Sequence, residues 1–159
     1  MPKTPRTPPP PPITIGWREY VAFPQWGIAG VLAKVDTGAR TSSLHVADIA
    51  ELEDGRVRFD VVLSRRFADR RVRVEARQVR TAQVRSSRGD LEPRRVVVAQ
   101  MQLGTVLEEI EIGLVCRKKM ICRMLLGRSA LAGRFLVDAD KAFTLGPAPR
   151  RKEPGGATP

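Results

Sequence analysis

Residues 31–40 read VLAKVDTGAR, an apolar segment that runs directly into an aspartate, a threonine and a glycine. The segment before Asp36 is typical of a buried strand, and a carboxylate at the end of such a strand is costly unless hydrogen bonds or a nearby charge stabilise it. Gly38 permits a tight loop whose backbone N–H groups reach the carboxylate, and the hydroxyl of Thr37 can fix that loop. These three residues alone also suit an ordinary Asx turn, so they do not settle the fold.

Much of the following sequence alternates apolar and polar residues with a period of two, which predicts strands. The alternating runs lie at residues 57–63, 72–74, 96–103 and 106–114. Turn signals separate them at residues 54–55, 88–90 and 104. Only residues 128–132 have a helical pattern, long enough for a turn or two. Several short strands with frequent turns predict an all-β barrel or sandwich.

The length of 159 residues and a hydrophobic fraction of 42% suit one domain with a packed core. We expect this domain at residues 13–146, between a disordered proline-rich leader at 1–12 and a disordered tail at 147–159. No apolar run approaches the roughly 20 residues that span a bilayer, so we expect no membrane contact. The first twelve residues lack the apolar stretch of a secretory signal, which predicts a cytoplasmic protein.

The formal net charge of +11 favours anionic partners, either nucleic acid or acidic proteins. Aromatic residues make up only 5% of the chain, which weakens the case for a module that stacks single-stranded RNA bases. Cys116, Cys122 and His45 are too few for an ordinary zinc site of about four Cys and His ligands, and neither HExxH nor a P-loop is present. We therefore expect no metal or cofactor, and free cysteines rather than a disulfide.

A second segment, MLLGRSAL at residues 124–131, places an apolar pair and Gly127 before the short helical pattern. An acidic loop, a long β stretch with a glycine-tipped hairpin and such a closing element are the layout of a retropepsin protomer. The chain resembles the retropepsin-like aspartic peptidases, in particular a bacterial family that carries the label of ATP-dependent zinc protease. The stretches that carry the resemblance are residues 15–19, 33–45, 84–87 and 123–138. It implies a closed barrel with one short C-terminal helix.

The resemblance implies that Asp36, Thr37 and Gly38 form the catalytic loop of an aspartic endopeptidase. Such enzymes need two carboxylates that share one proton around a water molecule. The chain has a single Asp-Thr-Gly, so the second aspartate has to come from a second copy across a two-fold axis. We therefore predict a homodimer, in which Thr37 can bridge the two active-site loops.

Further residues are predicted to bind substrate. They are Ala39 and Arg40 after the catalytic loop, Ser86, Ser87 and Gly89 in a flap hairpin, and Gly127 with Arg128 in the closing element. Gly127 is expected to pack against the Asp36 loop, where a Cβ would intrude. Positions 88 and 90 depart from the family pattern of serine and histidine, which puts the usual flap contacts in doubt.

Arg40 and Arg128 are expected near each other beside the cleft, where a carboxylate has to balance them. One alternative is an internal ion pair, with Asp48, Glu92 and Asp138 as candidates. The other is a substrate carboxylate held by guanidinium forks.

The resemblance implies acidic or glutamylated protein tails as substrates, with an ATP-grasp glutamate ligase or a ribosomal protein as partner. The alternatives are a catalytically silent adaptor that regulates such a ligase, and a basic RNA- or ribosome-binding module.

Overall fold

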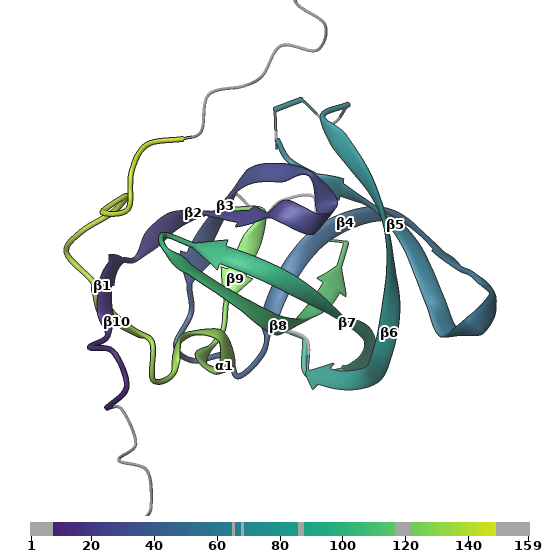
Figure 1. Cartoon of the computed structure of the whole chain (residues 1–159). Helices are drawn as coiled ribbons and strands as arrows, with labels where there is room; N and C mark the ends of the chain where they lie inside the picture. Colours follow the sequence, from purple (N-terminus) through teal and green to yellow (C-terminus); the bar gives the residue numbers. More distant parts are fainter. Residues whose placement is uncertain (1–7, 65, 68, 86–87, 117–121, 149–159) are drawn as a thin grey trace, which may run out of the picture.

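The computed structural model describes residues 8–148 apart from 65, 68, 86–87 and 117–121, and strands dominate it (Figure 1). The strands are β1 Ile13–Gly16, β2 Arg18–Phe23, β3 Ile28–Val35, β4 Ser42–Glu51, β5 Arg56–Val62, β6 Arg71–Arg85, β7 Leu91–Leu103, β8 Val106–Val115, β9 Met124–Leu126 and β10 Phe135–Asp138. The helical segments are α1 Arg128–Leu131 and two 3-10 turns, Pro24–Trp26 and Glu53–Gly55. No helix in the described part of the chain could span a membrane.

The main sheet closes on itself. Hydrogen-bonded neighbours follow the order β2-β3-β9-β4-β8-β7, and β7 pairs with β2 again. Strands β5 and β6 form a second path from β4 to β7, and their hairpins project from the ring (Figure 1). The separate pair β1 and β10 runs parallel. The predicted all-β closed barrel with one short C-terminal helix is confirmed.

The alternation of apolar and polar residues in the sequence accounts for three of the longer strands. The runs at 57–63, 96–103 and 106–114 lie in or overlap β5, β7 and β8, and the turn after β7 uses Gly104 at a φ of +61°. Strand β6 is much longer than the predicted 72–74, since it continues to Arg85. Beyond Val74 its half-buried positions include Ala76 and Gln78, so the apolar signal fades while the pairing with β7 continues.

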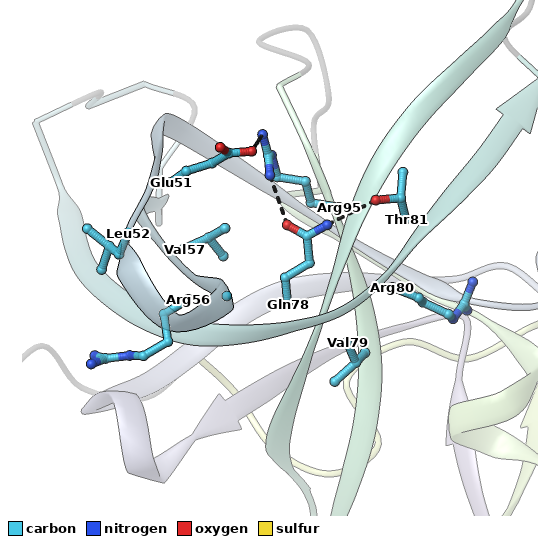
Figure 2. A pocket seen from close by; sticks show the side chains of 10 residues that line it. Glu51, Leu52, Arg56, Val57, Gln78, Val79, Arg80, Thr81 and Arg95 are labelled. Carbon is cyan, nitrogen blue, oxygen red and sulfur yellow. Dashed lines mark hydrogen bonds and ion pairs between the residues drawn. The ribbon is translucent and has the colours of Figure 1, made fainter.

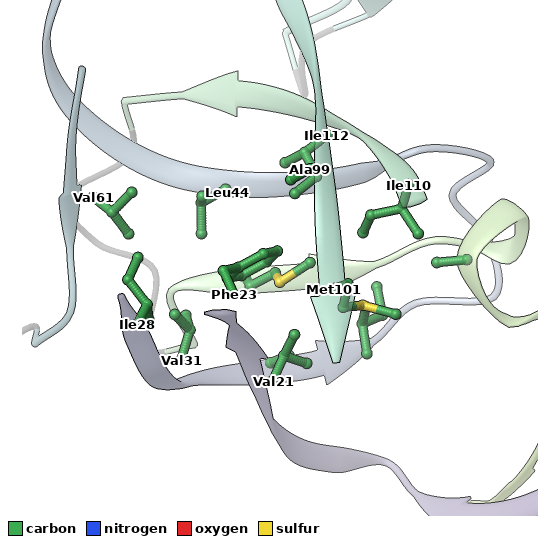
Figure 3. Packing of buried hydrophobic residues seen from close by; sticks show 14 of the residues in the cluster. Val21, Phe23, Ile28, Val31, Leu44, Val61, Ala99, Met101, Ile110 and Ile112 are labelled. Atoms are coloured by element: carbon green, nitrogen blue, oxygen red, sulfur yellow. The ribbon is translucent and has the colours of Figure 1, made fainter. Parts of the chain in front are cut away.

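The interior of the ring is filled by aliphatic side chains around Phe23 (Figure 3). The Phe23 and Trp26 rings stack with centroids 4.9 Å apart, and Trp26 meets Phe59 edge-on at 5.8 Å. Val31 and Ala33 on β3 are fully buried in the same core. The strand that leads to Asp36 is therefore anchored in the core through one of its faces.

A buried carboxylate ties the C-terminal segment to the barrel. Glu19 on β2 has no exposed surface, and its two oxygens accept hydrogen bonds from four donors. These donors are the Gly16 N–H at 2.7 Å, the Thr144 N–H and hydroxyl at 3.1 and 2.8 Å, and the Leu145 N–H at 3.2 Å. These hydrogen bonds replace the water that a buried carboxylate loses, so they offset the cost of its burial.

We expect Glu19→Gln to lower the free energy of unfolding by about 2–4 kcal/mol, because an amide NH2 would then face groups that are themselves donors. Urea unfolding followed by tryptophan fluorescence measures the loss. The matched control is Glu109→Gln, an exposed position on β8, which should stay within about 0.5 kcal/mol of wild type. Equal effects of the two substitutions would contradict the structural role of Glu19.

The two cysteines are free, as expected, and differ in environment: Cys116 is exposed and Cys122 is buried. Burial raises the pKa of the Cys122 thiol, and the nearby positive charges of Arg18, Lys34 and Arg123 only partly offset this. We expect a thiol-reactive probe to label Cys116 rapidly near neutral pH and Cys122 only after denaturation. Peptide mapping of the labelled sites by mass spectrometry checks this, and equal labelling in the native protein would contradict it.

Candidate active site

Asp36 lies where β3 leaves the sheet. The end of β3 pairs in parallel with β9, and Val35 is opposite Leu126. The Asp36 N–H donates to the Leu126 carbonyl at 2.9 Å. On its other edge β9 pairs antiparallel with β4, the strand that follows the Asp36 loop. The three-residue strand β9 therefore passes between the two strands that the loop connects.

The loop folds back on its own aspartate. The Gly38 N–H donates to Asp36 Oδ1 at 3.0 Å, and the Ala39 N–H donates to the Asp36 carbonyl at 3.2 Å. A Cβ at position 38 would lie 3.1 Å from the same Oδ1, so glycine leaves room for this hydrogen bond. Thr37 and Gly38 are exposed, whereas Asp36 is half-buried.

Gly127 is buried directly beneath the loop. A Cβ on it would lie 2.6 Å from the carbonyl carbon of Thr41 and 2.9 Å from that of Arg40, which the backbone cannot accommodate without moving. The Gly127 N–H donates to Ser42 Oγ at 3.0 Å. The close approach therefore joins the closing element to the far end of the Asp36 loop.

The start of α1 completes this clamp. The Arg128 and Ser129 N–H groups donate to the carbonyls of Ala39 and Arg40 at 2.8 and 3.0 Å. These N–H groups have no partner within the helix, so the loop satisfies them. The Arg128 guanidinium donates to the Thr37 carbonyl at 2.8 Å.

A cleft of about 750 Å³ opens beside Asp36. Its walls come from the Asp36 loop with the start of β4, from β6, β7 and β8, and from single residues of β9 and α1. The lining residues are Asp36, Ala39, Arg40, Thr41, Ser42, Ser43, Arg80, Ala82, Gln83, Val84, Arg85, Arg94, Val96, Glu111, Gly113, Leu125 and Ser129. Four arginines against two carboxylates make this cleft basic.

One of the two carboxylates is already neutralised. Arg80 on β6 donates to Glu111 Oε2 through Nε at 3.1 Å and through Nη2 at 2.8 Å. Arg40 has no ion-pair partner in the part of the chain that the structure describes. Of the candidate internal partners, Asp48 pairs with Arg71 at 3.0 Å, and Asp138 lies 3.9 Å from Lys141.

The side chain of Arg94 lies in the wall of the cleft because the residue that faces it is a glycine. Gly113 on β8 lies beside β7, and a Cβ there would be 2.9 Å from the Arg94 Cδ. The absence of a side chain lets the aliphatic stem of Arg94 lie across β8 in the wall of the cleft. Glycine inside a strand often marks such a close approach.

The predicted site residues fall into three groups. Asp36, Ala39 and Arg40 line the cleft. Thr37, Gly38, Gly127 and Arg128 lie outside its lining and build or hold the loop. Gly89 forms the turn between β6 and β7 at a φ of +86°, and its carbonyl accepts a bond from Arg85 at 3.3 Å. Ser86 and Ser87 lie outside the described residues.

Sequence reasoning did not identify Arg80, Arg85, Arg94 or Glu111 as cleft residues. The charges of β6 look like a solvated strand face, because nothing local indicates which side faces the Asp36 loop. Gly113 within a predicted strand was the available signal for Arg94. It could not be interpreted without the pairing of β7 with β8.

The chain is similar to known proteins over most of its length. It is 37% identical over 135 residues to a protein named a probable alpha-L-glutamate ligase from Shewanella halifaxensis, and 36% identical over 137 residues to one of that name from Parasynechococcus marenigrum. These matches cover 83% and 84% of this chain, which spans only 30% and 29% of those relatives.

A crystal structure of a Legionella pneumophila protein of unknown function has the same fold, with a TM-score of 0.72 and 27% identity. The superposition covers 84% of this chain and 98% of that one. The family described as retropepsin-like aspartic endopeptidase RimB matches residues 14–147. This match includes the Asp36 loop, the closing element and every strand that lines the cleft. The chain belongs to the RimB-like family of retropepsin-like aspartic endopeptidases.

Proposed function

We propose that the protein is a homodimeric aspartic endopeptidase in which Asp36 of each protomer supplies half of the catalytic pair. The observation that carries the proposal is a carboxylate held on a clamped loop at the wall of a large cleft. Within one chain the other cleft carboxylate, Glu111, is bound to Arg80 and is not available as a partner. A second copy, with its exposed Thr37 and Gly38 against those of the first, brings the second Asp36 to the site.

The reaction follows from two adjacent carboxylates. Like charges about 3 Å apart cannot both ionise, so the pair holds one proton. The ionised Asp36 takes a proton from water as the water oxygen attacks the peptide carbonyl carbon. The protonated Asp36 donates to the carbonyl oxygen. When the tetrahedral intermediate collapses, the C–N bond breaks and the departing amine takes up a proton from the pair.

The clamp around the loop supports this assignment. The Gly38 N–H holds Oδ1 of Asp36, which fixes the orientation of the carboxylate before substrate arrives. We assign to Thr37 a bridging role between the two loops, since its side chain lies exposed next to the aspartate. Arg128 supports the same loop through the Thr37 carbonyl.

The proposed substrates are acidic or glutamylated protein tails. Arg40, Arg85 and Arg94 give the cleft wall positive charges that suit substrate carboxylates. Two much longer relatives that contain a region like this chain are named for glutamate ligation. We propose an ATP-grasp glutamate ligase as the partner that makes the tail, and a ribosomal protein as a carrier of it.

The names of these relatives also favour a second candidate, a catalytically silent adaptor that regulates such a ligase. Both candidates share the fold and the basic cleft. They differ in whether the carboxylate of Asp36 is required for the protein's activity.

Mass spectrometry of acidic and glutamate-tailed peptides, incubated with wild type or Asp36→Asn in the presence of a chelator, separates the candidates. We expect wild type to cleave them and the variant to lose at least about 10³-fold in rate, because an amide cannot serve as the base. Circular dichroism of both proteins provides the folding control. Cleavage by Asp36→Asn at the wild-type rate would overturn the peptidase assignment, and no cleavage by either protein across the acidic and neutral range would favour the adaptor.

The cleft arginines give a second expectation. Arg40→Gln and Arg94→Gln should each raise the KM for a glutamate-rich peptide about 5–10-fold, since a charge-assisted hydrogen bond is lost. Gly113→Ala should act in the same direction as Arg94→Gln, because its Cβ displaces the Arg94 stem.

The matched control is Arg66→Gln, which removes one charge from a loop that does not line the cleft. A glutamine-rich peptide serves as the neutral substrate, for which the cleft substitutions should change the KM less than about twofold. If the cleft substitutions and the control reduced cleavage of the acidic peptide equally, net charge rather than the cleft would explain the preference.

A further inference from the structure

A second cavity, of about 410 Å³, lies between the β4–β5 turn and β6 (Figure 2). It is lined by Glu51, Leu52, Gly55, Arg56, Val57, Gln78, Val79, Arg80, Thr81 and Arg95. Three of these residues are arginines, and each of them has a carboxylate partner: Glu75 for Arg56, Glu111 for Arg80 and Glu51 for Arg95. The catalytic proposal makes no use of this cavity.

The cavity exists because two strands part. Strand β5 pairs with β6 only as far as Arg56 opposite Arg77, where the chain of β5 has just left the turn at Glu53–Gly55. From Gln78 onwards β6 pairs with β7, with a register shift at Val79, whose side chain is 44% exposed. No described strand pairs with the other edge of β6 over residues 78–85.

The side chain of Arg95 in the wall of the cavity is held in a fixed arrangement. Arg95 donates to Gln78 Oε1 at 2.8 Å and to Glu51 Oε1 at 2.6 Å. Gln78 in turn donates to Thr81 Oγ1 at 3.0 Å, as Figure 2 shows. A guanidinium held by two partners is preorganised for a further acceptor, because little side-chain freedom remains to be lost.

The second cavity and the Asp36 cleft share a wall. Arg80 lines both of them, and the unpaired edge of β6 runs from Gln78 beside one to Arg85 beside the other. An unpaired strand edge is a template for an extended peptide, which adds to it through backbone hydrogen bonds. The strand positions from Ala82 to Gln78 span about 13 Å at about 3.3 Å per residue.

We propose that the second cavity is a distal subsite, which binds an acidic side chain about four residues from the scissile bond on the same protomer. This inference rests on the proposed function and adds a length requirement to it. A run of carboxylates is held at the cleft by Arg40, Arg85 and Arg94. At the distal subsite a substrate carboxylate binds Arg95 in exchange for Glu51, whose side chain is 70% exposed. The protein therefore selects long acidic tails over short ones.

The test uses fluorescence anisotropy to measure how tightly the protein binds labelled oligo-glutamate peptides. The peptides contain two, four, six or eight glutamates. The protein is the full chain with Asp36→Asn, so that bound peptide stays intact. We expect affinity to rise by about tenfold or more between two and eight glutamates, in line with one or two added charge-assisted contacts. Arg95→Gln should reduce this gain about fivefold.

Glu51→Gln is a variant that we expect to strengthen peptide binding, whereas Arg95→Gln weakens it. It removes the carboxylate that pairs with Arg95, so the eight-glutamate peptide should bind more tightly than to the parent protein. A general loss of folding would not strengthen binding. Arg66→Gln is the matched charge control, because Arg66 lines neither cavity, and it should leave the gain with length as in the parent.

Equal gains with length in the parent, Arg95→Gln and Glu51→Gln proteins would overturn the distal subsite. The peptidase proposal would stand in that case, because binding by the Asp36→Asn protein does not depend on cleavage. Conversely, a gain that Arg95→Gln removes and Glu51→Gln increases would support the subsite even if wild type cut no peptide.

Discussion

The close approach of Gly127 to the backbone at Arg40 and Thr41 is the constraint on which the rest of the site depends. It allows β9 to lie between β3 and β4 and α1 to begin against the loop, where its first N–H groups meet the carbonyls of Ala39 and Arg40. The backbone carbonyls of the loop thereby accept hydrogen bonds from α1 instead of from water. The carboxylate of Asp36 is therefore carried by a fixed loop. Such preorganisation is what general acid–base chemistry requires, since a small displacement of a catalytic group is costly in rate.

Part of the positive charge of the molecule lies in the cleft beside this loop. Arg80 and Glu111 neutralise each other between the two cavities, whereas Arg40 faces the cleft with no ion-pair partner among the described residues. Part of the net charge of +11 therefore lies where a substrate would bind. An acidic peptide would meet complementary charge at the cleft.

The all-β class and the loop containing Asp36 could be predicted from local signals, whereas the closed barrel followed from the resemblance to retropepsin-like peptidases. Alternating apolar residues indicate strands, and Asp36 with Gly38 after a buried strand indicates a tight loop. The lack of an ion-pair partner for Arg40 among the described residues and the position of Arg94 in the cleft wall could not be predicted, because both depend on which strands pair. Gly113 and Arg94 are nineteen positions apart and meet only through the pairing of β7 with β8. The same limit applies to β6, whose far half has a weak apolar pattern and is defined by its ladder with β7.

The central claim is that one catalytic site needs Asp36 from two protomers. The most direct measurement mixes wild type with Asp36→Asn in varying proportions, allows subunits to exchange, and records cleavage of an acidic peptide at constant total protein. If the pair is shared, activity falls with the square of the wild-type fraction, because mixed dimers contain one aspartate and one asparagine and are inactive. Activity that falls in direct proportion to the wild-type fraction would mean that each protomer works alone, and would contradict the account.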